Sequence, residues 1–215
     1  MHRFLTSLLA SIALTSPLVR AEELLSKQTL SNWEFITATP ADINTVCTAG
    51  DDGVLAIVGK PVGYLVTKAD HENYQLHFEW RWPANAAKNC NGGVLLNISS
   101  GPANITPWPV CFQAQLKMDH AGDLLPMAGA TFAEKLTTAP DAKTPQLDHV
   151  AASNEKPLGE WNTGDIICQG DSIEISINGV KQNHVTKCVP ATGKIGFQLE
   201  GAPFELRNVR VSPVK

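Results

Sequence analysis

The chain has 215 residues, a formal net charge of −4 and 43% hydrophobic residues, which suits one globular domain of ordinary size. The charged residues form no basic block, and nucleic-acid binding normally needs a basic stripe, so no nucleic-acid partner is expected. The five cysteines include no C-x-x-C pair, which leaves zinc-ribbon and thioredoxin-like classes without support.

The N-terminus has the pattern of a secretory signal peptide. Arg3 supplies a short positive region, residues 4–14 are mostly apolar, and Val19 and Ala21 stand at the two positions that a signal peptidase reads. We therefore expect cleavage after Ala21, a secreted or periplasmic location, and a single mature domain over residues 22–215. The apolar run is too short to span a membrane as a mature helix, and no later segment approaches that length. An uncleaved N-terminal anchor is the alternative.

Export would permit disulfide bonds between the cysteines of the mature chain. Their number is odd, so at least one thiol would remain unpaired, and the sequence does not decide which cysteines could pair. No cofactor is expected, while the need for a divalent cation and the oligomeric state stay open.

Hydrophobic alternation with a period of two predicts β-strands along most of the chain. In chain order, these strands are expected at residues 53–58, 62–66, 74–82, 92–98, 110–117, 163–168, 171–177, 194–201 and 204–212. Asn178-Gly179, directly after one of them, is the strongest short signal for a β-hairpin. Many antiparallel strands with one solvent-facing side predict an all-β protein, a two-sheet antiparallel jelly-roll sandwich.

Residues 119–160 break this rhythm, because they are rich in Gly, Pro, Ala and Thr and show no sustained alternation. Such a long irregular loop is unusual in a compact domain and is often functional, so we expect it to form a wall or lid of any site. Within it, Asp119, His120 and Asp123 could bind a cation or move a proton, or could simply form an ordinary turn.

The polar faces of the predicted strands carry planar hydrogen-bonding groups. Gln, Arg and Glu side chains offer paired donors or acceptors that suit sugar hydroxyls, and tryptophans in loops offer apolar plates for sugar rings. Each of these residues could instead be an ordinary surface or packing residue. The pairs are Glu79 with Arg81, Gln113 with Gln115, Gln198 with Glu200, and Glu205 with Arg207, and the loop tryptophans are Trp108 and Trp161.

Several familiar catalytic motifs are absent from the sequence. There is no G-x-S-x-G, which argues against an α/β-hydrolase, and no Gly-rich phosphate loop. His71 and His77 are six residues apart, which does not match the spacing of a helical zinc pair.

Five stretches occur in the order and approximate spacing of a known domain family: FEWRW, NCNGGVLLN, WPVCFQAQLKMDHAGDLL, SNEKPLGEWNTGDIICQGDSIEISING and GKIGFQLEGAPFELRNVRV. Over about residues 25–213, the chain resembles the 3-keto-disaccharide hydrolase domain family, long called DUF1080. The resemblance implies a concanavalin A-like jelly-roll sandwich, export from a bacterial cell, and a glycoside hydrolase acting on a disaccharide or a polysaccharide-derived sugar.

Two departures from the family pattern bear on this expectation. The family usually has Asn-Ser-Gly where this chain has Asn91-Gly92-Gly93, which is a mild change. The family usually has an acidic residue where this chain has Gln113, and a glutamine cannot exchange a proton as a carboxyl group does. If that acid is catalytic in relatives, this chain either binds sugars without cleaving them or uses another pair of acids.

Glycoside cleavage commonly needs two carboxyl groups, about 5–5.5 Å apart for retention and about 6.5–9.5 Å apart for inversion. Among the acids on the predicted polar faces, Glu79 and Glu200 are the expected catalytic pair. The expected substrate-binding residues are Arg81, Asn91, Gln113, Gln115, Trp161, Gln198 and Arg207, with no metal ligands.

Three functions remain open from the sequence. The first is a secreted hydrolase with a carbohydrate substrate, and the second is a non-catalytic carbohydrate-binding module of the cell envelope or exterior. The third is a structural domain of the cell envelope with no affinity for sugars.

Overall fold

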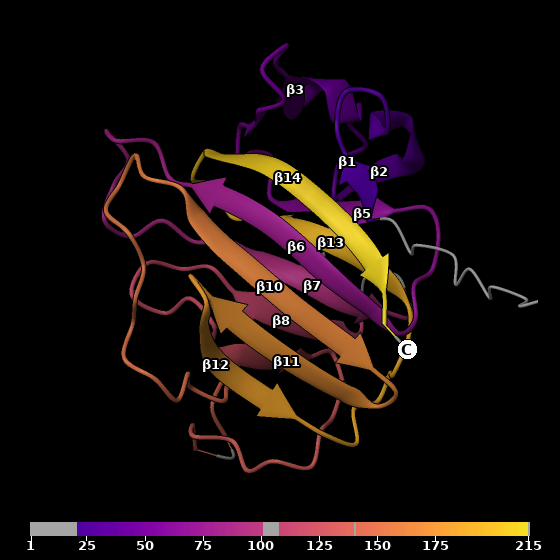
Figure 1. The fold of residues 1–215 in the computed structure, drawn as a ribbon, viewed down its shortest axis with the longest axis vertical. Coiled ribbons are helices and arrows are strands. Elements are labelled where there is room, and N and C mark those ends of the chain that lie inside the picture. Colours follow the sequence, from indigo (N-terminus) through magenta and orange to yellow (C-terminus); the bar gives the residue numbers. More distant parts are fainter. Residues whose placement is uncertain (1–20, 101–107, 140, 215) are drawn as a thin grey trace, which may run out of the picture.

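The computed structural model describes residues 21–100, 108–139 and 141–214, which form two antiparallel β-sheets packed face to face (Figure 1). This arrangement confirms the predicted all-β, two-sheet sandwich. The predicted signal peptide lies, apart from Ala21, outside the described residues. No helix within these three ranges is long and apolar enough to cross a membrane.

The larger sheet has eight strands, with β6 and β10 near its centre (Figure 1). β1 pairs with β14 at the side of the main path. In spatial order, the strands of the path are β12 (Val180–Val185), β11 (Ser172–Ile177), β10 (Asn162–Gln169), β6 (Tyr74–Arg81), β14 (Phe204–Pro213), β4 (Leu55–Ile57) and β3 (Cys47–Ala49), and β1 is Glu22–Leu25.

The smaller sheet has six strands and lies behind the larger one in Figure 1. Two short 3-10 helices, η1 (Leu30–Asn32) and η2 (Ile43–Thr45), are the helical elements of the described residues. In spatial order, the strands of the smaller sheet are β2 (Trp33–Thr37), β5 (Gly63–Thr67), β13 (Lys194–Leu199), β7 (Gly93–Ile98), β8 (Cys111–Gln115) and β9 (Leu124–Met127).

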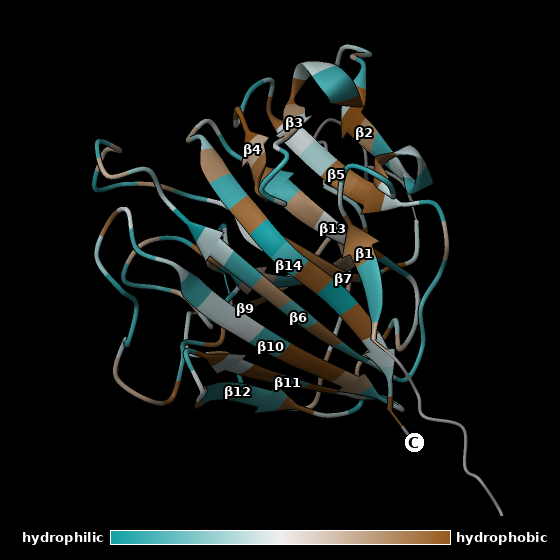
Figure 2. Ribbon diagram, turned by 45° about the horizontal axis from the view of Figure 1, so that its top comes forward, coloured by the Kyte–Doolittle hydropathy of each residue, from teal (hydrophilic) through white to brown (hydrophobic). Residues whose placement is uncertain are grey.

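The inward-facing side chains of both sheets form one hydrophobic core. Every second residue along β6 and β10 is buried, and Figure 2 shows a similar alternation of hydropathy along β14. Phe78 of β6 meets Phe197 of β13 edge to face, with ring centroids 5.7 Å apart, which joins the two sheets. The predicted hairpin is also confirmed, because Asn178 and Gly179 both have positive φ between β11 and β12.

The outer face of the smaller sheet is more buried than the predicted solvent-facing side of a sandwich. All residues of β5, β7 and β8 are buried, including polar ones that alternation assigns to the outer side. Loops therefore cover part of the outer face of this sheet, and hollows remain between the strands and the loops.

The prediction that residues 119–160 form an irregular loop is wrong for one segment. Leu124–Met127 form β9, which pairs with the edge strand β8 and supplies partners for its backbone groups. β9 is short and contains Pro126, so it lacks the alternation by which strands are recognised in a sequence. The described residues between β9 and β10 contain no further strand.

All five cysteines are buried and free, so none of the disulfides that export would permit is formed. Burial raises the pKa of the Cys47 and Cys168 thiols to about 12. Since the thiolate is the reactive form, these groups behave as small apolar packing residues at neutral pH.

Candidate functional site

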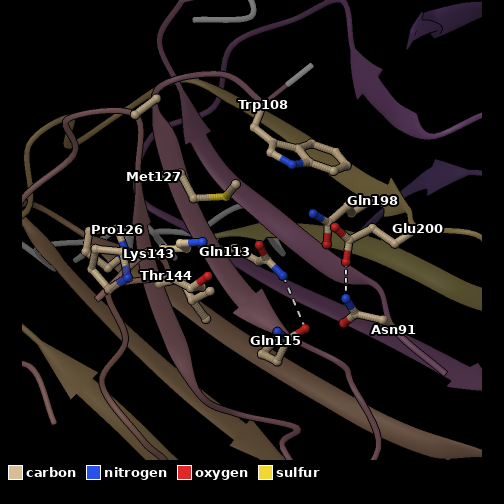
Figure 3. A pocket seen from close by; sticks show the side chains of 13 residues that line it. Asn91, Trp108, Gln113, Gln115, Pro126, Met127, Lys143, Thr144, Gln198 and Glu200 are labelled. Carbon is tan, nitrogen blue, oxygen red and sulfur yellow. Dashed lines mark hydrogen bonds between the residues drawn. The ribbon is translucent and has the colours of Figure 1, made fainter. Parts of the chain in front are cut away.

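A cleft of about 560 Å³ lies on the outer face of the smaller sheet (Figure 3). Its floor comes from β8 and β13, and β9 and the loop around Lys143 form the wall across from Glu200. Among the residues that line the cleft are Asn91, Trp108, Gln113, Gln115, Met127, Lys143, Thr144, Gln198 and Glu200.

Two amides of β8 form the polar floor of the cleft. Gln113 and Gln115 lie on the same side of the strand, and Gln113 Nε2 donates to Gln115 Oε1 at 3.1 Å (Figure 3). The same Oε1 accepts the backbone N–H of Leu116 at 3.1 Å, so the amide of Gln115 is held in a fixed orientation. Gly93, on the neighbouring strand β7, makes this possible, because a Cβ there would lie 2.7 Å from Gln113 Cγ.

Gln198 of β13 is 1% exposed, and its side chain lies beside Glu200 in the cleft (Figure 3). Within the described part of the chain, its Oε1 has no hydrogen-bond donor. A buried acceptor without a partner costs about 1–3 kcal/mol. A hydroxyl group bound in the cleft would supply that partner.

Glu200 follows β13 directly and is the one carboxylate among the described residues that line the cleft. Its side chain accepts a hydrogen bond from Asn91 Nδ2 (Figure 3). Burial raises the pKa of this carboxyl above its usual value, while the Asn91 hydrogen bond and the positive charge of Lys117 oppose the rise. A half-buried carboxyl with a raised pKa is a stronger base, once ionised, than an ordinary surface carboxylate.

Trp108 forms an aromatic corner of the cleft. Its ring lies 6.4 Å from the ring of Tyr64, with an interplanar angle of 41°. The exposed part of Trp108 offers an apolar surface beside the amide floor, as the loop position of this residue predicts.

The structure separates the expected catalytic pair. Glu79 lies on β6 of the larger sheet and faces away from the core, whereas Glu200 lines the cleft on the smaller sheet. Arg207 donates to Glu79 through Nε at 2.8 Å and Nη2 at 2.6 Å, and Asn208 Nδ2 donates at 2.5 Å. The prediction that Glu79 and Glu200 share a cleft is therefore wrong, because alternation shows which face of a strand a residue occupies but not which sheet the strand joins.

Three expected substrate-binding residues lie with Glu79 on the larger sheet, outside the cleft. Two guanidinium groups lie over the ring of Trp161, with Arg207 Cζ 4.1 Å and Arg81 Cζ 4.6 Å from the ring centroid. Arg81 also donates to Glu205. Both arginines thus make contacts within the protein, and Arg81, Trp161 and Arg207 do not join the other expected residues in the cleft. Their role toward a substrate stays a prediction.

The cluster predicted from Asp119, His120 and Asp123 is a structural clasp centred on one buried carboxylate. Asp123 is 1% exposed and accepts His120 Nδ1 at 3.0 Å, Gln146 Nε2 at 2.8 Å and the backbone N–H of His149 at 2.7 Å. His149 Nδ1 also contacts Asp123 at 2.5 Å. These bonds fix the loop that carries Lys143 and Thr144 to the cleft, and no group of three or more metal-type side chains is found among the described residues.

Asn91, Gln113, Gln115, Gln198 and Glu200 were expected at the site, and the structure brings them together in one cleft. Their roles toward a substrate stay predictions. Lys143, Thr144 and Met127 also line the cleft and were not expected, because nothing in an irregular loop indicates which residues turn back onto a sheet.

The family model described as 3-keto-alpha-glucoside-1,2-lyase-like domain matches residues 20–212. No curated protein matches the chain. Among solved structures, a candidate glycosyl hydrolase from Parabacteroides distasonis ATCC 8503 is 20% identical, with a TM-score of 0.63 over 91% of this chain and 100% of the other.

Two further solved structures share the fold at low identity. A carbohydrate-binding module from Bacillus subtilis is 9% identical, with a TM-score of 0.57 over 84% of this chain and 95% of the other. A variant of LamA from Zobellia galactanivorans, in complex with laminaritriose and laminaritetraose, is 10% identical, with a TM-score of 0.53 over 85% of this chain and 92% of the other.

Proposed function

Because the chain belongs to the 3-keto-alpha-glucoside-1,2-lyase-like domain family, we propose that the cleft binds a 3-keto-glycoside and releases its glycosidic substituent by elimination. The observation that carries the proposal is the single carboxylate, Glu200, among the described residues lining the cleft. Hydrolysis through acid and base carboxyls needs two such groups about 5–9.5 Å apart. Elimination beside a ketone needs one base, because the ketone already acidifies the neighbouring C–H bond.

In the proposed reaction, the Glu200 carboxylate takes the proton from C2 of the sugar, and the C2–H electron pair forms an enolate with the C3 ketone. The enolate then re-forms the ketone as the C1–C2 double bond is made and the bond from C1 to the glycosidic oxygen breaks. The leaving oxygen takes up a proton, so no net oxidation or reduction occurs. Amide N–H groups of the floor and the Lys143 ammonium are placed in the cleft to stabilise negative charge on the enolate oxygen.

The other polar groups of the cleft bind the sugar hydroxyls. The unpaired Oε1 of Gln198 accepts a hydroxyl proton from the sugar, which removes the cost of the buried acceptor. Asn91 holds the carboxyl of Glu200 in place while it takes the proton.

The test is to incubate the full-length mature protein with methyl 3-keto-α-glucoside and to identify the products by mass spectrometry. Elimination gives an unsaturated keto-sugar lighter by one water than the 3-keto-glucose that hydrolysis would give. We expect the unsaturated product, and a loss of turnover of at least about 100-fold for Glu200→Gln, the scale of a lost general base. Formation of 3-keto-glucose, the hydrolysis expected from the sequence, would refute elimination, and undiminished turnover by Glu200→Gln would refute the role of that residue.

A non-catalytic carbohydrate-binding module is the second candidate, and Gln113 favours it. That residue stands where the family usually has an acid, so the floor of the cleft is rich in groups that bind hydroxyls and poor in groups that move protons. In this case calorimetry would record binding of the 3-keto-glycoside with no product formed.

We also propose export to the periplasm or exterior. The sequence of residues 1–21 supports it, and so does the start of β1 at Glu22, directly after the expected cleavage point. Mass spectrometry of the exported chain should find Glu22 at its N-terminus, and retention of Met1 in the cytoplasm would contradict the proposal.

A further inference from the structure

A second hollow of about 520 Å³ lies on the outer face of the smaller sheet, toward β2 and β5. Its floor is mostly apolar and comes from four side chains on three strands: Ile36 of β2, Tyr64 and Val66 of β5, and Ile98 of β7. Its charged rim includes Glu34, Asp70 and Lys194, and the Lys194 ammonium lies 3.5 Å from Asp70 Oδ1. None of these residues is used in the proposed elimination.

One aromatic pair stands at the border between the hollow and the amide cleft. Tyr64 lines the hollow and Trp108 lines the cleft, and their rings contact each other. Tyr64 is also the direct cross-strand partner of Gln198 on β13, so the two floors share a boundary between neighbouring strands. A ligand whose sugar sits on Gln198 therefore has its next group beside Trp108 and Tyr64.

The two floors differ in the chemistry that they can bind. The cleft presents amides and a carboxylate, which pair with hydroxyl groups, whereas Ile36, Val66 and Ile98 have no polar atoms in their side chains. The rim carries polar groups, including Ser99, Ser100 and Thr192, so a second sugar would find hydroxyl partners at the rim only. Its hydroxyl groups that face the aliphatic floor would stay without partners, which is unfavourable. A flat apolar ring would bury the same floor without that cost, and acids at the rim could accept hydrogen bonds from phenolic hydroxyls.

We propose that this hollow is the binding site for an aromatic leaving group, so that the substrates are aryl 3-keto-glycosides. The inference rests on the proposed function of the cleft and adds the class of the group that is released. The hollow positions the aryl group while the cleft holds the sugar, and it selects among substrates that share the same 3-keto-sugar.

The experiment compares phenyl and methyl 3-keto-α-glucosides, which differ only in the group that would enter the hollow. The affinity of each is measured by calorimetry on Glu200→Gln, in which no turnover is expected. We expect phenyl to bind about ten-fold more tightly, the scale of one well-placed apolar group in a pocket. Equal affinities would overturn the inference, and so would tighter binding of the 3-keto-disaccharide than of the phenyl glycoside.

Two further substitutions locate the effect. Ile36→Ser and Val66→Thr, each added to Glu200→Gln, should reduce the preference for phenyl over methyl by about three- to five-fold and leave the affinity for methyl unchanged. Val62→Ser, at a residue that is 46% exposed and outside the lining of the hollow, is the matched control and should leave the preference intact. A preference unchanged in all three variants would place the aryl group elsewhere and overturn the inference.

The failure of the proposed function and the failure of this inference are distinguishable. If the cleft binds but does not react, the parent protein gives no product while the phenyl preference is still measured. If the leaving group is not aromatic, product forms from both glycosides and the phenyl preference is absent.

Discussion

Replacing Trp161 by alanine should destabilise the fold and leave the cleft intact. The ring contacts the guanidinium groups of Arg81 and Arg207, with Cζ atoms 4.6 Å and 4.1 Å from its centroid, on the sheet opposite the cleft. Each stack contributes about 0.5–1 kcal/mol at a partly exposed site, and the lost packing of the half-buried ring adds about 1 kcal/mol. The free energy of unfolding should therefore fall by about 2–3 kcal/mol.

For a chain of this size, that loss corresponds to a melting temperature lower by about 4–12 °C. Calorimetric melting measures it, and titration of the Glu200→Gln form with methyl 3-keto-α-glucoside should give the same affinity with and without Trp161→Ala. Trp161→Phe keeps an aromatic ring beside the arginines and should lose about half as much stability. Trp108→Ala is the complementary variant, because that ring borders the cleft, and it should weaken sugar binding. The reasoning is refuted if Trp161→Ala melts like the parent while its sugar affinity falls, since Trp161 would then belong to a binding site.

Three more predictions follow from contacts in and near the cleft. Asn91→Ala removes a hydrogen bond that favours ionised Glu200, so the pKa of Glu200 should rise further. The acid limb of a kcat/KM profile should then move to higher pH, and an unmoved limb would show that another group is the base. Asp123→Asn should lower the free energy of unfolding, measured in urea, by about 2–4 kcal/mol, because the N–H groups that donate to the carboxylate would face the NH₂ group of the new amide. A loss below about 0.5 kcal/mol would contradict the structural role of Asp123. Gly93→Ala should weaken sugar binding, measured by calorimetry, at least about ten-fold, because the added methyl group displaces the Gln113 side chain. An unchanged affinity would show that Gln113 does not contact the sugar.

Most of the sandwich could be predicted from the sequence because its strands alternate with period two. β6 and β11 carry apolar side chains at every second position, and the Asn178-Gly179 turn needs the positive φ values that these residues tolerate. β9 could not be predicted, since a short strand containing Pro126 forms only because the edge of β8 needs partners.

The site was predictable to the extent that its residues share a strand with a clear pattern. Gln113 and Gln115 on β8, and Gln198 with Glu200 at the end of β13, follow from alternation alone. Glu79 shows the limit of this reasoning, because its outward direction was correct while its sheet was not. Which strands join which sheet depends on long-range pairing, and a single strand carries no local signal for it.

The rate at which the buried thiols can be labelled reports how often the fold opens locally. They are spread over both sheets, because Cys111 belongs to β8, Cys168 to β10 and Cys47 to β3. An alkylating reagent can reach each thiol only when the surrounding strands separate, so the rate of labelling at each position measures how often that part of the sandwich opens. Because no disulfide ties the native state together, the same measurement can be made under reducing conditions without weakening the fold.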